Sequence, residues 1–193
     1  MKTAICTIIK DEHLYLKEWI DWHLDIGFNA IYLLEDKGSK SHESITSEYD
    51  NVFLRSYATD IELQECFKTY NHGNQQDRLY FWFSENYKDI YDWVAYIDVD
   101  EFINFEDNYT LQNLCEEYID YPAVLLYWKM MGASGHIKKP KCGVVEAYTN
   151  ETPLIPGEEG WSYKSFVNLK KYEGFTNLHT ACHILEKQYP VEL

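Results

Sequence analysis

The run from Trp93 to Phe102 constrains the fold most, because an apolar stretch ends there in three carboxylates within four residues. The apolar part is rich in β-branched and aromatic side chains and is too short for a helix. It therefore predicts a strand buried on both faces, as in a parallel sheet. In open α/β sheets, ligands bind just beyond the carboxyl ends of such strands. Asp98, Asp100 and Glu101 follow the strand at that place, so a binding site is expected there.

The spacing of the two aspartates suits a divalent cation. In an extended chain Asp98 and Asp100 lie on the same side of the backbone, with Val99 opposite. Two hard oxygen donors on one side can share Mg²⁺ or Mn²⁺. Glu101 either points away from both aspartates, anchors the turn or faces the acceptor. An Asp-x-Asp spacing arises by chance about once in a chain with roughly 13 aspartates, so a solvated turn is the alternative interpretation.

The order of apolar and polar stretches predicts an α/β fold. Strands and helices alternate along the first third of the chain, which is typical of a parallel, doubly wound sheet. No internal repeat or linker is evident, so one domain over residues 1–193 is expected. The expected strands are 3–9, 30–34, 52–55, the apolar run that begins at Trp93, 123–128, 143–148 and 163–169, and the expected helices are 12–26, a short one from 43, 62–87 with a break near 71–73, and 110–118.

Charge and cysteine content limit the partners and the compartment. The net charge of -15 argues against a nucleic acid or an anionic membrane as the main partner. Five scattered cysteines without a CxxC spacing suggest neither a disulfide framework nor a Cys-based zinc site, which favours a reducing compartment. No signal peptide or membrane-spanning run is evident. We therefore expect a cytoplasmic protein with no transmembrane segment and at most peripheral membrane association.

Several segments together resemble a known family. The stretch from Ile9 to Glu12, the stretch from Tyr15 to Leu24 and the strand around Ile31 resemble the opening of GT-A-type glycosyltransferases of the family-2-like and family-92-like group. Their pattern is a strand, a helix containing "YL.EW..(Y/W)H", and a second strand ending in Asp. The resemblance continues in the same order through most of the chain. Gln75 or Gln76 followed by Trp93–Phe102 resembles "Q…W…(I/L)D.DEF", and Lys164–Val167 followed by His179 resembles "K(S/G)(I/F)V…H".

Two stretches depart from that pattern. The first turn has Lys10-Asp11-Glu12 where an Asn-Glu pair is more typical, and the loop after Asp36 has Lys37-Gly38-Ser39 instead of an Asn-rich sequence. The resemblance implies a GT-A fold, a three-layer α/β/α arrangement with a mostly parallel sheet. It implies a metal-dependent transferase that moves a sugar from a nucleoside-diphosphate donor, UDP-sugar favoured, to a glycan or glycolipid acceptor. Residues 1–105 would bind the donor, and residues 106–193 would bind the acceptor and complete the metal site.

The resemblance also assigns roles around the metal. Asp100 would be the main ligand of Mn²⁺ or Mg²⁺, and Asp98 would contact the metal or the donor ribose. His179 would complete the site, with His183 as the competing ligand. A cation at this place would stabilise the negative charge that develops on the departing diphosphate.

Further residues are expected to contact the donor. The backbone from Thr7 to Ile9 would line the base, and Gln76 would lie on the donor side. Asp36 could accept the imide N–H of uracil, or it could be a turn residue. Lys164 would neutralise a donor phosphate, or it would be a surface lysine.

The sequence also suggests candidates for the catalytic base and two competing functions. Glu158 and Glu159 are candidate bases by their location in a glycine-rich segment. A haloacid-dehalogenase-like phosphatase would use Asp98 as nucleophile, but its motif is expected near the first strand. A non-catalytic sugar-binding domain is the third possibility. Trp19, Trp22 and His23 of the first helix are expected to be core residues.

Overall fold

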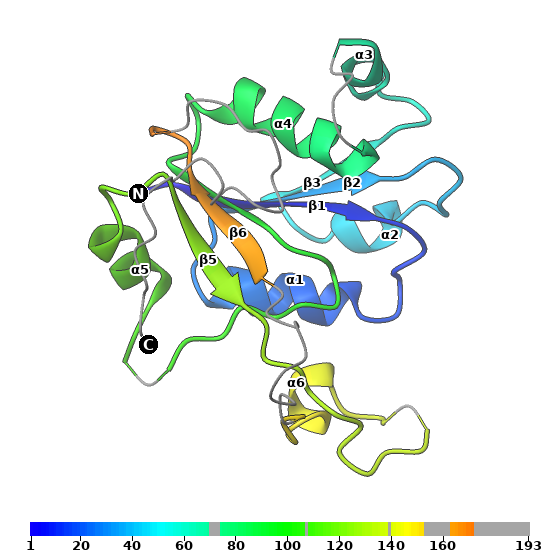
Figure 1. Ribbon diagram of the computed structural model, residues 1–193. Helices are drawn as coiled ribbons and strands as arrows, with labels where there is room; N and C mark the ends of the chain where they lie inside the picture. The colour runs from blue at the N-terminus through cyan, green and yellow to red at the C-terminus, as the bar shows by residue number, and fades with distance from the viewer. Residues whose placement is uncertain (70–73, 107, 139, 153–162, 172–193) are drawn as a thin grey trace.

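The computed structural model forms an open six-stranded sheet between two layers of helices (Figure 1). This confirms the predicted three-layer α/β fold with a mostly parallel sheet. The structure describes residues 1–69, 74–106, 108–138, 140–152 and 163–171. The strands are β1 (Thr3–Ile9), β2 (Ala30–Glu35), β3 (Val52–Ser56), β4 (Trp93–Tyr96), β5 (Ala123–Tyr127) and β6 (Tyr163–Asn168). The helices are α1 (Leu16–Asp25), α2 (Glu43–Thr46), α3 (Ile61–Thr69), α4 (Gln75–Tyr87), α5 (Leu111–Glu117) and α6 (Val144–Ala147).

The strand order is β3-β2-β1-β4-β6-β5. The first four strands in that order run parallel, β6 runs antiparallel to β4, and β5 runs antiparallel to β6. Because two reversals restore the direction, β5 runs the same way as β4. The carboxyl ends of β1, β2, β4 and β5 therefore share one edge of the sheet, which we call the carboxyl edge. β6 begins at this edge.

Alternating side chains of the strands pack into two separate cores. Ala4 and Cys6 of β1 face a cluster formed with α3 and α4, whereas Ile5 and Ile9 face a cluster formed with α1, α2 and α5. Trp93 of β4 is fully buried in the second cluster. Strands apolar on both faces must be covered on both sides. In Figure 1, α3 and α4 lie on one face of the sheet, and α1 lies on the other.

The helix ends follow from local sequence. α1 is shorter at its start than predicted, because residues 10–15 form a turn in which Asp11 adopts a positive φ of 58°. Gly27, with φ of 110°, follows its end as expected for a helix stop. α4 begins with a capping box in which Asn74 and Asp77 each accept a hydrogen bond from the other's backbone N–H. The capping box fixes where α4 meets the carboxyl edge, whereas Gly27 ends α1 at the opposite edge, before β2.

The strand predicted over residues 143–148 is wrong, because this stretch forms α6. The carboxylate of Glu18 in α1 accepts hydrogen bonds from the backbone N–H groups of Val144 at 2.8 Å and Val145 at 3.2 Å. A carboxylate at a helix N-terminus satisfies free donors and suits the helix dipole. A tertiary contact, invisible in the local β-branched pattern, decides the structure here.

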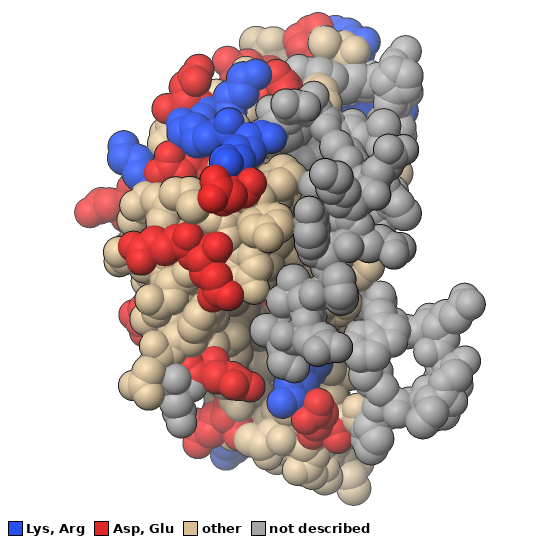
Figure 2. Space-filling view, turned by 60° about the vertical axis from the view of Figure 1, so that its left-hand side comes forward, with Lys and Arg blue, Asp and Glu red and all other residues tan. Residues whose placement is uncertain are grey.

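Acidic side chains dominate the charged surface. On the face shown in Figure 2 they are scattered from top to bottom, whereas basic side chains gather mainly in one cluster near the upper edge. Among the described helices, none combines the length and apolar character needed to cross a bilayer.

Candidate active site

The aspartates that follow β4 lie in a turn and not in a continued strand. Ladder pairing ends at Tyr96, and the backbone N–H of Glu101 donates to the carbonyl oxygen of Asp98 at 3.1 Å. Val99 is buried in the cluster formed with α1, α2 and α5, whereas Asp98 is partly exposed and Asp100 is exposed. Both aspartates follow the strand, as the sequence predicted, although the backbone turns there instead of continuing in the extended alternation expected for them.

Glu101 anchors this turn. Its Oε2 accepts the backbone N–H of Asp98 at 2.8 Å, so its side chain folds back toward the aspartate instead of pointing away. Burial raises the pKa of Glu101, and the N–H of Asp98 and the ammonium of Lys164 oppose that rise. Of the sequence interpretations for Glu101, the structure shows the anchoring role.

Lys164 of β6 is a buried partner of the turn and not a surface lysine. Its Nζ lies 2.5 Å from Oδ2 of Asp98 and 3.3 Å from Oε1 of Glu101, and the residue is only 7% exposed. It also lies 5.5 Å from the ring centre of Trp128. One ammonium faces a turn with three acidic residues, so the turn stays net negative.

Gln76 connects α4 to the same turn. Its Nε2 lies 3.3 Å from Oδ1 of Asp98 and 2.9 Å from the hydroxyl oxygen of Tyr80. Both carboxylate oxygens of Asp98 thus have a donor, one from α4 and one from β6. The structure brings together Gln76, Asp98 and Lys164, which lie far apart in sequence.

Asp36 lies at the end of β2, at the same edge. Its carboxylate accepts hydrogen bonds from Nε2 of Gln75 at 2.8 Å, from the backbone N–H of Lys37 at 2.7 Å and from Nζ of Lys10 at 3.2 Å. Burial alone would raise the pKa of Asp36, but these three donors together lower it. Asp36 is therefore an ionised acceptor whose orientation is fixed by two loops and α4.

The predicted base-lining backbone of β1 lies beside Asp36. Thr7 is fully buried within the strand, and the carbonyl oxygen of Ile9 accepts the backbone N–H of Asp36 at 2.9 Å. Of the backbone predicted to line the base, only the end at Ile9 therefore lies at the carboxyl edge.

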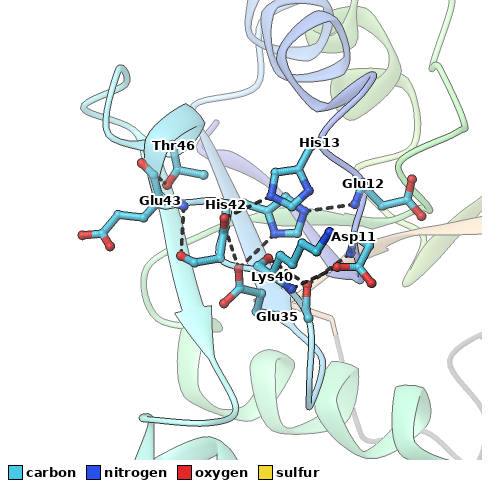
Figure 3. A network of polar contacts seen from close by, with 10 residues as sticks. Asp11, Glu12, His13, Glu35, Lys40, His42, Glu43 and Thr46 are labelled. Atoms are coloured by element: carbon cyan, nitrogen blue, oxygen red, sulfur yellow. Dashed lines mark hydrogen bonds and ion pairs between the residues drawn. The ribbon is translucent and has the colours of Figure 1, made fainter.

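A buried histidine joins the two loops that flank Asp36 (Figure 3). Nε2 of His42 accepts the backbone N–H of Glu12 at 3.0 Å, so the ring proton is on Nδ1, which donates to Oε1 of Glu35 at 2.9 Å. The same oxygen accepts the backbone N–H of His42 at 2.8 Å, and His13 stacks on the ring at 4.0 Å. The network fixes the loop after β1 against the loop after β2.

Sequence reasoning missed a second support, given by α1. The indole N–H of Trp19 donates to the carbonyl oxygen of Glu101 at 2.7 Å, and that of Trp22 donates to Ile103 at 2.7 Å. Nε2 of His23 accepts the backbone N–H of Ile103 at 3.2 Å. Trp19 and His23 are buried as predicted, whereas Trp22 is only partly buried, because its indole lies at the edge where it bonds Ile103. All three hold the backbone that follows the acidic turn. Their i, i+3, i+4 spacing, which places them on one helix face, was the available signal.

The described residues are compatible with a hard divalent cation without forming a complete site. They contain no group of three potential His, Cys, Asp or Glu ligands, while the exposed carboxylate of Asp100 is open to solvent. Carboxylate oxygens suit Mg²⁺ or Mn²⁺, and Mg²⁺ usually keeps several water ligands. The predicted residues Glu158, Glu159, His179 and His183 lie outside the described residues.

The fold and site define a class of α/β protein with an open, mostly parallel sheet and acidic residues where β2 and β4 end. The predicted resemblance to family-92-like glycosyltransferases is confirmed by two curated relatives. A glycosyltransferase family 92 protein of Oryza sativa subsp. japonica is 27% identical over 149 residues, 76% of this chain and 24% of the relative. One of Ricinus communis is 23% identical over 150 residues, 76% of this chain and 26% of the relative. The chain thus spans about a quarter of the length of these relatives.

Comparisons with family models and with solved structures gave the following results. No protein-family model matches the chain. Among solved structures, a 4-diphosphocytidyl-2C-methyl-D-erythritol synthase from Anaerococcus prevotii is similar at a TM-score of 0.41 and 13% identity, covering 88% of this chain and 70% of its own. Mouse xyloside xylosyltransferase 1 is similar at a TM-score of 0.41 and 12% identity, covering 88% of this chain and 67% of its own.

Proposed function

We propose that this chain acts in glycosyl transfer, moving a sugar from a nucleoside-diphosphate donor, with UDP favoured, to a glycan or glycolipid acceptor. The observation that carries the proposal is the similarity to family 92 glycosyltransferases over three quarters of the chain. The acidic turn at Asp98 and Asp100 lies at the carboxyl end of a central strand, where α/β folds bind ligands. The residues expected to bind the donor converge there from β2, β4, β6 and α4.

In this proposal the donor diphosphate lies beside the acidic turn. Asp100, with Asp98 in the same turn, would hold Mn²⁺ or Mg²⁺, which would supply positive charge to stabilise the departing diphosphate. Gln76 and Lys164 orient Asp98, and the Lys164 ammonium adds a second positive charge on the phosphate side. An acidic protein can thus bind an anionic donor.

The base of the donor would lie beside β1 and β2. Asp36 is held with its carboxylate at the carboxyl edge, and it would accept the imide N–H of uracil. The end of β1 at Ile9 would contact the face of the base. Residues 1–105 would bind the donor in this arrangement.

The acceptor side remains a proposal from the sequence. Glu158 or Glu159 would remove the acceptor proton if the sugar is transferred with inversion, and His179 would complete the metal shell, with His183 as the alternative ligand. These residues belong to the half at 106–193 that would bind the acceptor.

Calorimetry with UDP, GDP and CDP, each with and without Mn²⁺, tests the proposal. We expect UDP binding that requires Mn²⁺ and that weakens at least about tenfold in Asp100→Asn, which keeps the shape of the side chain but removes its charge. Asp89→Asn is the matched control, because Asp89 is also exposed but lies before β4, at the opposite edge of the sheet. Equal UDP binding with and without the metal would contradict the metal role. A phosphoenzyme formed on Asp98 from an aryl phosphate would favour the phosphatase alternative.

A further inference from the structure

Residues 128–145, from the end of β5 into the first turn of α6, protrude beyond the sheet (Figure 1). We call this stretch the β5–α6 segment. It leaves the sheet at the carboxyl edge, because Tyr127 of β5 pairs with Tyr163 of β6 and β5 runs in the direction of β4. The position of Trp128 beside the Lys164 ammonium places the start of the segment next to the candidate site.

The β5–α6 segment exposes an unusual concentration of large apolar side chains. Five of the thirteen exposed large apolar residues in the described part of the chain fall within these eighteen positions. Ile137 is 99% exposed. Single exposed apolar residues are ordinary on a soluble protein, whereas a concentration of them marks an interaction surface. The five are Trp128, Met130, Met131, Ile137 and Val145.

The charge of this stretch is opposite to that of the rest of the molecule. No Asp or Glu occurs from Tyr121 to Val145, a stretch with four lysines, while the rest of the chain carries all 32 acidic residues and 13 of the basic ones. Acidic side chains next to this stretch include Glu18 of α1, which binds the α6 backbone, and Glu151, which pairs with Lys129 at 3.2 Å. Glu146 follows the stretch in sequence, and Asp120 precedes it. The exposed Lys138 and Lys141 form no ion pair with any described residue. The lysines of the stretch are Lys129, Lys138, Lys139 and Lys141.

The exposure is built into the backbone of the segment. The N–H of Gly132 donates to Asn150 at 2.7 Å, and the carbonyl oxygen of Met130 accepts from Thr152 at 2.8 Å. The turn that presents Ile137 contains Ser134 and Gly135 at positive φ, and it is closed by a 2.8 Å hydrogen bond from His136 to Ala133. The capping of α6 by Glu18 fixes the far end of the segment. The exposed position of Ile137 is therefore held by backbone hydrogen bonds on both sides of its turn.

We propose that the β5–α6 segment binds the surface of an anionic lipid bilayer. Its apolar side chains would enter the headgroup region, and Lys138 and Lys141 would pair with lipid phosphates. Exposed Trp and aliphatic side chains interleaved with lysines are the composition of interfacial membrane elements. The overall negative charge does not prevent this, because screening over about 8 Å at physiological salt leaves the local charge dominant. Binding in this orientation turns the carboxyl edge of the sheet toward the bilayer.

Vesicle sedimentation of the full chain tests the proposal. We expect binding to phosphatidylcholine vesicles that contain roughly a third phosphatidylglycerol, and much weaker binding to pure phosphatidylcholine. The double variant Ile137→Ser/Lys138→Glu should bind the anionic vesicles at least about tenfold more weakly. The matched control is Ile61→Ser/Lys68→Glu on α3, which also combines an exposed isoleucine, 71% exposed, with an exposed lysine. This control should bind like the parent chain.

A fluorescent label reports which surface makes the contact. Cys142 lies in the segment and is exposed, whereas Cys6, Cys66 and Cys115 are buried. In a Cys182→Ser background, an environment-sensitive fluorophore on Cys142 should shift to shorter wavelength when anionic vesicles are added.

Three results would overturn the proposal. They are no sedimentation with anionic vesicles, an equal loss in the α3 control, or an unchanged emission of the label while the protein sediments. A segment that instead binds a protein would give the first result. Because no nucleotide is present, these outcomes are independent of the calorimetric test of glycosyl transfer.

Discussion

Lys164 shows how one side chain sets the charge of the acidic turn. Its ammonium is buried between Asp98 and Glu101, so its loss would leave two carboxylates facing each other without a counter-charge. We predict that Lys164→Met, which keeps the aliphatic stem, lowers the free energy of unfolding by about 1–3 kcal/mol, discounted because Asp98 is partly exposed. Urea denaturation at neutral pH measures this. The control Lys68→Met removes the exposed pair with Glu65 and should cost under about 0.5 kcal/mol. Equal losses in both variants would contradict the role given to Lys164.

His23 makes the stability of the protein depend on pH. Burial lowers the pKa of His23 from its ordinary 6.5 to about 4, although its hydrogen bond to the carbonyl oxygen of Trp19 opposes the shift. Between these values the unfolded chain binds a proton that the folded chain does not. Stability is therefore fully present above pH 6.5 and decreases as the pH falls toward 4. One unit below the ordinary pKa the loss should be about 1.4 kcal/mol.

Denaturation curves at pH values of about 7.5 and 5.5 check this prediction. His23→Gln removes the titrating ring and should be less stable at both values, but its loss between them should be smaller by the amount stated. The same decrease in both proteins would show that other groups cause it.

At the level of elements, the sequence predicted nearly every strand and helix of the described residues, because strands apolar on both faces and helices with one apolar face leave clear periods. The failures share a cause. α6 depends on Glu18, which lies in α1, far away in sequence, and the acidic turn depends on Glu101 folding back onto Asp98. Neither tertiary contact is visible in local pattern.

Part of the candidate site was predictable as well, because residues that directly follow a strand can be recognised from the sequence pattern. Asp98, Asp36 and Gln76 were found because they follow strands or match a family motif, and the structure places them at one edge. The burial of Lys164 and the support from α1 required contacts between elements.

The histidine between the first two loops gives a prediction at the element scale. His42→Ala would remove a donor from the buried carboxylate of Glu35 and the acceptor of the Glu12 N–H. We expect a loss of about 3 kcal/mol in the free energy of unfolding. Faster hydrogen exchange at the Glu12 amide is expected as well. His42→Asn can still donate to Glu35 and should lose less. Equal losses would contradict the importance of the Glu35 contact.

For the whole molecule, charge repulsion should matter more than in a balanced protein. Acidic residues number 32 against 17 basic ones, and repulsion among exposed carboxylates destabilises the compact state. Raising the ionic strength from about 0.01 M to 0.1 M shortens the screening length from about 30 Å to 10 Å. We predict that the melting temperature rises by about 2–5 °C. Differential scanning fluorimetry in sodium chloride and in potassium chloride checks this. Equal rises in both salts indicate screening, and a fall would mean that surface ion pairs outweigh the repulsion.

The hydrogen bonds from Trp19 and Trp22 to the backbone at Glu101 and Ile103 join segments about eighty positions apart. They limit how the acidic turn can be exchanged between proteins. A chimaera that places residues 93–105 of this chain in a protein whose first helix lacks these tryptophans would lose both indole donors. The transferable unit is therefore discontinuous, and a working graft must move α1 together with the turn that it supports.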